Sequence, residues 1–190
     1  MSKFVLIDGH SILNRAFYGV PIFTNSEGLH TNAVFGFMNI MFKIIDSKQP
    51  DYMAVAFDVH QPTFRHEMFK DYKGTRKPMM EELREQVPVI KELLQKMNIT
   101  TVELPGYEAD DVIGTLSKKG EKAGMEVDVI SGDRDLLQLA SDHITICIPK
   151  TKKGQTTVEE YNTEGVRKLY KVTPTEFIDV KALKIGRAHV

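Results

Sequence analysis

Short apolar runs alternate along the chain with longer segments in which apolar residues recur every three or four positions. The short runs cover residues 4–7, 53–57, 100–104, 127–130 and 144–148. Short apolar runs bounded by turn residues are typical of strands that are buried on both faces. The pattern therefore predicts five strands.

The longer segments carry the periodicity of amphipathic helices. They predict helices through residues 12–17, over 33–45, 81–97 and 109–123, briefly over 135–139, and near 163–170 and 174–183. One face of the 33–45 helix carries Val34, Phe37, Met38, Met41, Phe42 and Ile45. Gly124 is expected to end the 109–123 helix, because glycine readily adopts the left-handed conformation found at helix C-termini.

This alternation of strands and helices predicts an α/β fold. Its central sheet is expected to be mostly parallel and flanked by helices on both faces. In such sheets ligands bind beyond the carboxyl ends of the strands. One stretch, residues 59–80, is polar, basic and poor in apolar periodicity, and we leave its structure unassigned.

Acidic residues follow four of the predicted strands. They are Asp8, then Asp58, then Glu108, Asp110 and Asp111, and finally Asp133 and Asp135. A parallel sheet would gather them at one edge, where mutual repulsion would raise their pKa values until some became protonated. Mg²⁺ and Mn²⁺ prefer oxygen ligands and would relieve that repulsion. Two such ions can stabilise the attacking and leaving oxygens of a phosphodiester displacement.

Each acid also has a simpler interpretation. Asp8-Gly9 is an ordinary strand-to-turn sequence, and Glu108, Asp110 and Asp111 could merely favour the positive N-terminus of their helix. The joint pattern, with acids at four successive strand ends, favours a metal site.

The basic segment, residues 64–78, is the most cationic part of the chain. Its cations are Arg65, Lys70, Lys73, Arg76 and Lys77, and its aromatic residues are Phe64, Phe69 and Tyr72. Cations that neutralise phosphates and aromatics that stack on bases suit single-stranded or frayed nucleic acid. A solvated surface loop is the alternative. The position just after Asp58 favours nucleic acid, since a basic segment would bring an anionic backbone to the metals.

The composition and motifs of the sequence restrict the other functions that the protein could have. The chain has 190 residues, 42% hydrophobic and 27% charged, and a net charge of −1, so any basic surface must be local. The single cysteine, Cys147, lies in an apolar run and is expected to be a buried hydrophobic residue. Zinc-like histidine spacing, a P-loop and a dinucleotide glycine motif are all missing from the sequence. With no signal peptide and no membrane-length apolar stretch, the sequence predicts a cytoplasmic protein without membrane contact.

Six short motifs resemble those of a known family. They are Leu6-Ile7-Asp8-Gly9, Phe57-Asp58, Phe64-Arg65-His66-Glu67, Tyr72-Lys73, Gly106-Tyr107-Glu108-Ala109-Asp110-Asp111 and Ser131-Gly132-Asp133-Arg134-Asp135. Together they resemble the N-terminal 5′→3′ exonuclease domain (flap endonuclease-like, PIN-like) of bacterial DNA polymerase I, from about residue 3 to residue 183. The Glu-Ala-Asp-Asp stretch combined with Gly-Asp-x-Asp is the specific part of this signal.

The resemblance implies a PIN-like sheet with a basic helical arch or loop over the active site, and two bound Mg²⁺ or Mn²⁺ ions. It assigns Asp8, Asp58, Glu108, Asp110 and Asp111 mainly to the first metal, and Asp133 and Asp135 to the second. Lys73 and Arg76 would act on the scissile phosphate. The set that contacts nucleic acid would be Arg65, Lys70, Tyr72, Lys73, Arg76 and Lys77.

The resemblance further implies a substrate and a cellular setting. The substrate would be DNA with a 5′ single-stranded flap or end, or an RNA primer in a duplex, cleaved during replication and repair. A polymerase domain is expected on the same parent chain, in the nucleoid-associated part of a bacterial cytoplasm.

The C-terminus departs from the family pattern. After Leu183 the family continues with a Gly-Asp-x-x-Asp-Asn-like segment and a helix-hairpin-helix, whereas residues 184–190 contain no acid. Codons for these seven residues resemble a common sequencing adapter. We therefore expect a nuclease domain over 1–183 that is C-terminally incomplete, a non-native tail over 184–190, and impaired activity.

Two other functions remain open at this point. The first is a PIN-like ribonuclease, which would share the acidic cluster but not the motifs around Tyr72 and Glu108. The second is a fragment that binds nucleic acid or metal without turnover.

Overall fold

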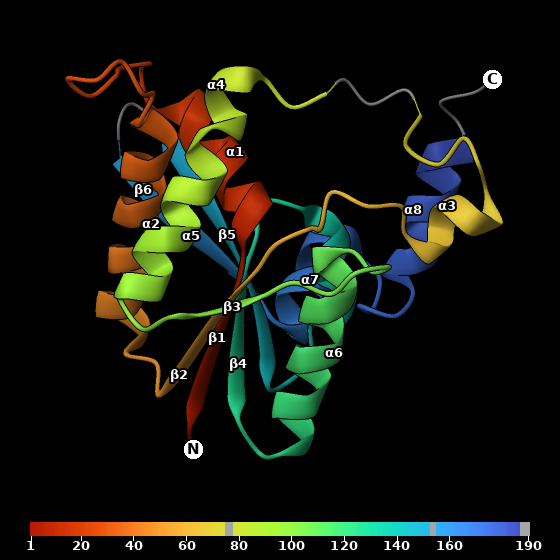
Figure 1. Cartoon of the computed structure of the whole chain (residues 1–190). Helices are drawn as coiled ribbons and strands as arrows, with labels where there is room; N and C mark the ends of the chain where they lie inside the picture. The colour runs from red at the N-terminus through yellow and green to blue at the C-terminus, as the bar shows by residue number, and fades with distance from the viewer. Residues whose placement is uncertain (75–77, 153–154, 187–190) are drawn as a thin grey trace.

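The computed structural model describes residues 1–74, 78–152 and 155–186 as an α/β fold (Figure 1). Its strands are β1 (Lys3–Asp8), β2 (Tyr52–Ala56), β3 (Thr100–Val102), β4 (Glu126–Ile130), β5 (Ile144–Lys152) and β6 (Gln155–Tyr161). Its helices are α1 (Gly9–Gly19), α2 (Asn32–Lys48), α3 (Phe64–Met68), α4 (Glu81–Arg84), α5 (Gln86–Lys96), α6 (Ala109–Lys122), the 3₁₀ helix η1 (Arg134–Leu139), α7 (Thr163–Tyr170) and α8 (Phe177–Gly186).

The sheet has the strand order β3-β2-β1-β4-β5-β6. Neighbouring strands from β3 to β5 pair in parallel, and β6 pairs antiparallel with β5. Figure 1 shows α1, α2 and α5 on one face of the sheet and α6 and α7 on the other. The predicted mostly parallel sheet with helices on both faces is confirmed.

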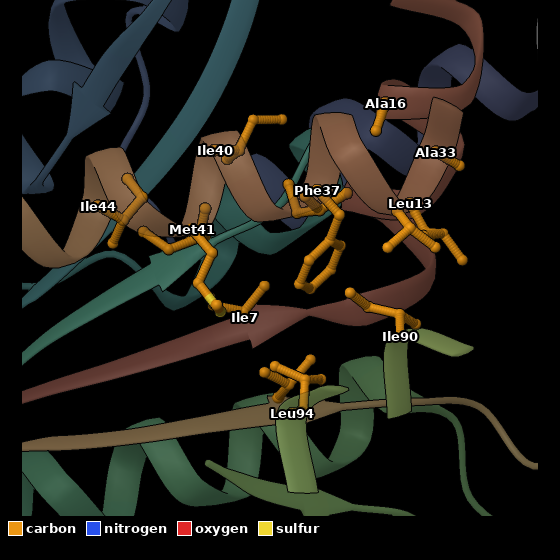
Figure 2. Close-up of a cluster of buried hydrophobic side chains, with 14 of the residues drawn as sticks. Ile7, Leu13, Ala16, Ala33, Phe37, Ile40, Met41, Ile44, Ile90 and Leu94 are labelled. Carbon is orange, nitrogen blue, oxygen red and sulfur yellow. The ribbon is translucent and has the colours of Figure 1, made fainter. Parts of the chain in front are cut away.

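The two faces of the sheet bury separate apolar clusters. Ile7 of β1 packs with the helices α1, α2 and α5, whereas the neighbouring Leu6 packs on the α6 side. Successive strand residues point to opposite faces, so a parallel strand between two helical layers is apolar at nearly every position. Figure 2 shows Ile7 beside Phe37 and Met41 of α2, with Leu94 of α5 opposite.

A buried amide pair sets the arrangement of three helices on this face. The Gln86 side chain is fully buried, and its Oε1 accepts hydrogen bonds from the backbone nitrogens of Ala33 (2.8 Å) and Val34 (3.1 Å). Its Nε2 donates to Asn32 Oδ1 at 3.1 Å, and Asn32 Nδ2 donates to the carbonyl of Phe17 at 3.1 Å. The pair thus satisfies orphan groups at the start of α2 and the end of α1.

Two predicted helices differ from the observed ones in detail. In α2 the buried residues include Phe37, Ile40 and Ile44, whereas Phe42 is 46% exposed, so its placement on one face with Phe37 is wrong. The reason is the 3.6-residue period, which turns Phe42 away from the stripe that faces β1. The predicted 81–97 helix is divided into α4 and α5, because Pro88 has no N–H to bond the carbonyl of Arg84.

The C-terminal third contains a strand that was not predicted. Strand β6 pairs with an extended β5 as far as Lys152 opposite Gln155, and its sequence is mostly polar. An edge strand needs one apolar face at most, so it lacks the continuous apolar run of a central strand. Helix α8 begins at Phe177 rather than Pro174 and runs to Gly186. The proposed division after residue 183 therefore lies inside a helix and stays a prediction.

Two predictions from composition can be compared with the described residues. Cys147 is fully buried, as expected for a small hydrophobic residue. None of the helices in the described ranges is long and apolar enough to cross a membrane.

Candidate active site

A cleft with a volume of ≈ 600 Å³ opens at the carboxyl edge of the sheet. The order of the strands reverses between β1 and β4, and this switch point is where open α/β sheets bind ligands. Five of the seven acids singled out from the sequence line the cleft: Asp8, Asp58, Glu108, Asp110 and Asp133. The parallel sheet therefore brings together carboxylates from four separate stretches of the chain.

Asp8 is the most buried of these acids. It is 5% exposed and is the N-cap of α1, its Oδ1 accepting from the backbone nitrogen of Ser11 at 3.0 Å. Its Oδ2 accepts from Ser131 Oγ at 2.8 Å. Burial raises the pKa of Asp8 to about 6, despite these two hydrogen bonds to its charged form. The next residue must be Gly9, because an added Cβ would lie 2.4 Å from the Phe57 ring.

Asp58 connects the end of β2 to the start of α6. Its Oδ1 accepts a hydrogen bond from the backbone nitrogen of Ala109 at 2.7 Å, which satisfies a free N–H in the first turn of α6. The backbone nitrogen of Asp58 donates to His10 Nδ1 at 3.1 Å. Both contacts hold the Asp58 carboxylate at the rim of the cleft.

Asp110 is the acid in strongest electrostatic conflict. Its pKa is raised to about 7, first by burial and then by the neighbouring charges of Asp8, Asp133 and Asp58. Within the described part of the chain, no donor makes a hydrogen bond to its carboxylate. A carboxylate in this position gains most from a cation.

Glu108 and Asp111 already have cationic partners. Lys73 Nζ lies 2.7 Å from Glu108 Oε1, and Tyr72 Oη lies 3.3 Å from Glu108 Oε2. Arg65 binds both carboxylate oxygens of Asp111 at 2.7 and 2.8 Å. This bidentate pair lowers the pKa of Asp111.

The last two acids lie around the start of η1. Asp133 Oδ1 accepts from the backbone nitrogen of Asp135 at 2.8 Å and so caps this helix. Asp135 forms an ion pair with Lys181 of α8. Asp135 and Asp111 line an adjoining hollow rather than the cleft itself. Their roles as metal ligands stay predictions.

The residues of the cleft suit a hard, hydrated divalent cation. The donors are carboxylate oxygens, which Mg²⁺ and Mn²⁺ prefer. In the ranges that the structure describes, no three His, Cys, Asp or Glu side chains are arranged to enclose one ion. Mg²⁺ usually keeps several waters and binds proteins through one or two carboxylates, so a tight cage is not required. The unpartnered, partly buried Asp110 carboxylate supports this fit.

Cationic and aromatic residues of the basic segment lie beside the acids. Lys73 lines the cleft, Arg65 and Tyr72 line the adjoining hollow, and Lys70 is exposed. Arg76 and Lys77 lie outside the described residues. The segment contains the short helix α3 followed by turns rather than one continuous helix.

Sequence reasoning missed several residues that line or support the cleft. The cleft is also lined by three residues of α1, namely His10, Ser11 and Asn14, and Ser131 donates a hydrogen bond to Asp8. The strand-end rule that found Asp8 could have found His10 and Ser11, since the first turn of the following helix also faces the carboxyl edge. His60 follows Asp58 by two residues, as His10 follows Asp8, and it also lines the cleft.

Comparison with known families decides the family of the chain. Residues 3–171 match the sequence profile of the family described as "5′-3′ exonuclease, N-terminal resolvase-like domain". The chain belongs to this family. The resemblance to the N-terminal part of bacterial DNA polymerase I is thereby confirmed.

Individual members of the 5′-3′ exonuclease family agree with this assignment. DNA polymerase I of Bacillus caldotenax is 51% identical over 181 residues, which cover 95% of this chain and 20% of that protein. DNA polymerase I of Bacillus subtilis (strain 168) has the same identity and coverage. The chain thus spans about a fifth of the length of these relatives.

Solved structures show the same fold. A bacteriophage T5 5′-exonuclease with bound zinc has a TM-score of 0.72 and 24% identity, over 95% of this chain and 65% of that one. A bacteriophage T5 flap endonuclease in a pseudo-enzyme–product complex with DNA and metal ions has a TM-score of 0.68 and 22% identity, over 92% and 62%. The PIN-like fold that the resemblance implied is confirmed.

Proposed function

We propose that this domain is a metal-dependent, structure-specific 5′-nuclease that hydrolyses phosphodiester bonds in DNA. The observation that carries the proposal is the convergence of Asp8, Asp58, Asp110 and Asp133 in one cleft, with Lys73 on its wall. An uncompensated group of carboxylates suits cations, and a neighbouring ammonium suits the phosphate that those cations attract. Membership of the 5′-3′ exonuclease family supports the same reaction.

The proposed cofactor is a pair of Mg²⁺ or Mn²⁺ ions. Asp8, Asp58, Glu108, Asp110 and Asp111 would serve mainly the first ion, directly or through water, and Asp133 and Asp135 the second. When bound, such ions supply an activated water and stabilise the leaving oxygen of the phosphodiester. Crystal structures of T5 relatives that contain metal ions are in line with this proposal.

The residues of this chain supply positioning and charge. Ser131 and the N-terminus of α1 hold the Asp8 carboxylate, and Asp58 is held through its hydrogen bond to α6. Lys73 Nζ would offset charge that develops on the scissile phosphate. Arg76 is proposed to act beside it.

The proposed substrate is DNA with a 5′ flap or end, including an RNA primer in a duplex. Support comes from the DNA polymerase I relatives and from the T5 and Rad2 structures that were solved with DNA. By the same comparison we propose a polymerase domain on the parent protein, and action at the nucleoid in a bacterial cytoplasm.

The experiment compares two proteins on three substrates. The 190-residue chain, and residues 1–183 joined to the downstream nuclease region of the Bacillus subtilis relative, are incubated with a 5′-flap DNA, a blunt duplex and a linear single-stranded RNA. We expect the joined protein to cut the flap near the junction with Mg²⁺ or Mn²⁺ and not with EDTA. Asp110→Asn should abolish cleavage.

The same assay separates the alternatives. Cleavage of the linear RNA in preference to the flap would favour a PIN-like ribonuclease. Metal binding without cleavage of any substrate would favour a non-catalytic fragment, and either result would overturn the proposal.

A further inference from the structure

Three ion pairs of different strength join the basic segment to the start of α6: Arg65–Asp111, Lys73–Glu108, and a longer contact of 3.7 Å between Arg65 Nη1 and Glu108 Oε2. Lys73 Nζ pairs with one oxygen of Glu108, Oε1, at 2.7 Å, with side-chain exposures of 29% and 11%, and lies 5.3 Å from the centroid of the Tyr72 ring. Arg65 instead makes two hydrogen bonds to Asp111 in a fork geometry. A bidentate guanidinium–carboxylate pair is geometrically specific, whereas a lysine ammonium is a point charge that is readily shared or displaced.

Several further contacts hold the Arg65 end in place. The guanidinium lies 4.5 Å from the centroid of the Phe64 ring, and that ring packs against Tyr107 at 5.7 Å. The backbone nitrogen of Phe64 donates to the carbonyl of Gly106 at 3.1 Å. Asp111 Oδ2 also accepts from the backbone nitrogen of Glu108 at 3.0 Å. The start of the segment is therefore attached to the α6 start by backbone, ring and ionic contacts together.

The Lys73 end is held by single rather than bidentate polar contacts: besides the Lys73–Glu108 pair, Tyr72 Oη donates to Glu108 Oε2 at 3.3 Å, and the Tyr72 ring packs against His66. Lys73 has a φ of +57°, a left-handed backbone conformation that non-glycine residues rarely adopt. It lies in a turn in which the nitrogen of Gly74 donates to the carbonyl of Asp71 at 2.9 Å. The Glu108 contact therefore holds a strained residue, and loss of that contact would let the turn relax.

The geometry points to a displaceable latch, in which the Lys73–Glu108 pair opens when a divalent cation takes the Glu108 carboxylate. Arg65–Asp111 stays closed and serves as the hinge, so that Asp111 would serve the ion through water only. Cation binding would thereby free Lys73 for the phosphate of the substrate, so that the lysine becomes available only when the cleft is loaded. This inference rests on the proposed metal-dependent function of the cleft.

A latch of this kind has a reciprocal consequence. If a cation must displace Lys73 from Glu108, Lys73 weakens cation binding, and its removal must strengthen that binding. Lys73→Met should therefore bind Mn²⁺ about fivefold or more tightly, as measured by calorimetry. Lys70→Met is the matched control, since it removes the same charge from an exposed position of the same segment. Equal gains in the two variants would overturn the latch, because they would report only the general field of the segment.

The direct test measures the reactivity of the Lys73 amine. The 190-residue chain is acetylated briefly with an N-hydroxysuccinimide ester, with Mn²⁺ or with EDTA, and each lysine is quantified by mass spectrometry. We expect Mn²⁺ to raise Lys73 acetylation several-fold. The acetylation of Lys150, which lies near the end of β5 and is paired with Glu159 at 2.6 Å, should not change. In Glu108→Gln, Lys73 should be reactive even in EDTA.

Calorimetry on the same samples separates the two proposals. If Mn²⁺ binds and Lys73 reactivity stays constant, the latch is wrong while the metal site stands. If Mn²⁺ does not bind at all, the proposed metal-dependent function fails, and the latch fails with it. A Glu108→Gln protein in which Lys73 stays protected without metal would also overturn the latch.

Discussion

Replacing Asp110 by asparagine should stabilise the metal-free protein at neutral and alkaline pH. Burial, then the charges of Asp8, Asp133 and Asp58, raise the pKa of Asp110 from 3.8 to about 7. The asparagine side chain keeps the shape of the aspartate and removes its charge. The substitution therefore tests repulsion with little change in packing.

The sign of the stability change follows from the direction in which the pKa of Asp110 is shifted. A carboxyl group whose pKa is higher in the folded state contributes stability below its unfolded pKa, and this contribution is lost as pH rises through the folded value. For Asp110 the loss falls between about pH 4 and pH 7. The full shift corresponds to roughly 4 kcal/mol at about 1.4 kcal/mol per pKa unit, as an upper limit. Water and salt reach the open cleft, so we expect about 1–2 kcal/mol.

The assay is urea or thermal unfolding in EDTA at about pH 8 and about pH 4. At the higher pH, Asp110→Asn should melt about 2–8 °C above the wild type, and at the lower pH the difference should vanish. Asp46→Asn is the matched control, because Asp46 is an exposed carboxylate on α2 and its removal should change little. Mn²⁺ should reverse the ranking, since the wild type, which keeps the Asp110 carboxylate, gains more binding energy from it.

The reasoning is refuted if Asp110→Asn is no more stable than the wild type at the higher pH. It is equally refuted if the stabilisation is the same at both pH values, because a charge effect must disappear when the carboxyl group is protonated. A similar gain in Asp46→Asn would mean that net charge, rather than the cleft, is responsible.

Three further experiments test contacts around the cleft and elsewhere in the fold. A double-mutant cycle of Arg65→Ala and Asp111→Asn should give a coupling energy of about 1–3 kcal/mol in urea unfolding, and a value near zero would contradict the hinge. Gln86→Leu should destabilise by about 2–4 kcal/mol, because the backbone N–H groups at the start of α2 lose their buried acceptor. Gly9→Ala should destabilise by about 1–3 kcal/mol through overlap with a buried ring, whereas Gly114→Ala, with 3.6 Å to its nearest neighbour, should be neutral or stabilising.

The sheet and the acidic cleft could be predicted from the sequence because both depend on local signals. Strands such as β1 must be apolar at every position when helices cover both faces, and this leaves a visible run. The residue that ends such a strand lies at the carboxyl edge whatever the rest of the chain does. Asp8 ends β1, Asp58 closely follows β2, and Asp110 lies in the first turn of the helix after β3, so these three acids could be placed at one edge before any tertiary contact was known.

Other features were decided only by the tertiary structure. Arg65 meets Asp111 across 46 residues of chain and Lys73 meets Glu108 across 35, and no local pattern specifies such partners. The sequence predicted Arg65 as a cation for nucleic acid, whereas in the fold both of its terminal nitrogens donate to the Asp111 carboxylate.

Whether an acid faces the cleft or a cationic side chain was likewise decided by the tertiary structure. Asp110 and Asp111 are adjacent in sequence, yet successive residues of a helix point about 100° apart, so one faces the cleft and the other faces Arg65. Composition and periodicity predict which helices and strands form and at which edge of the sheet the acidic residues gather. Which carboxylate has a cationic partner and which has none depends on side-chain directions and on contacts between distant segments, and these exist only once the chain is packed.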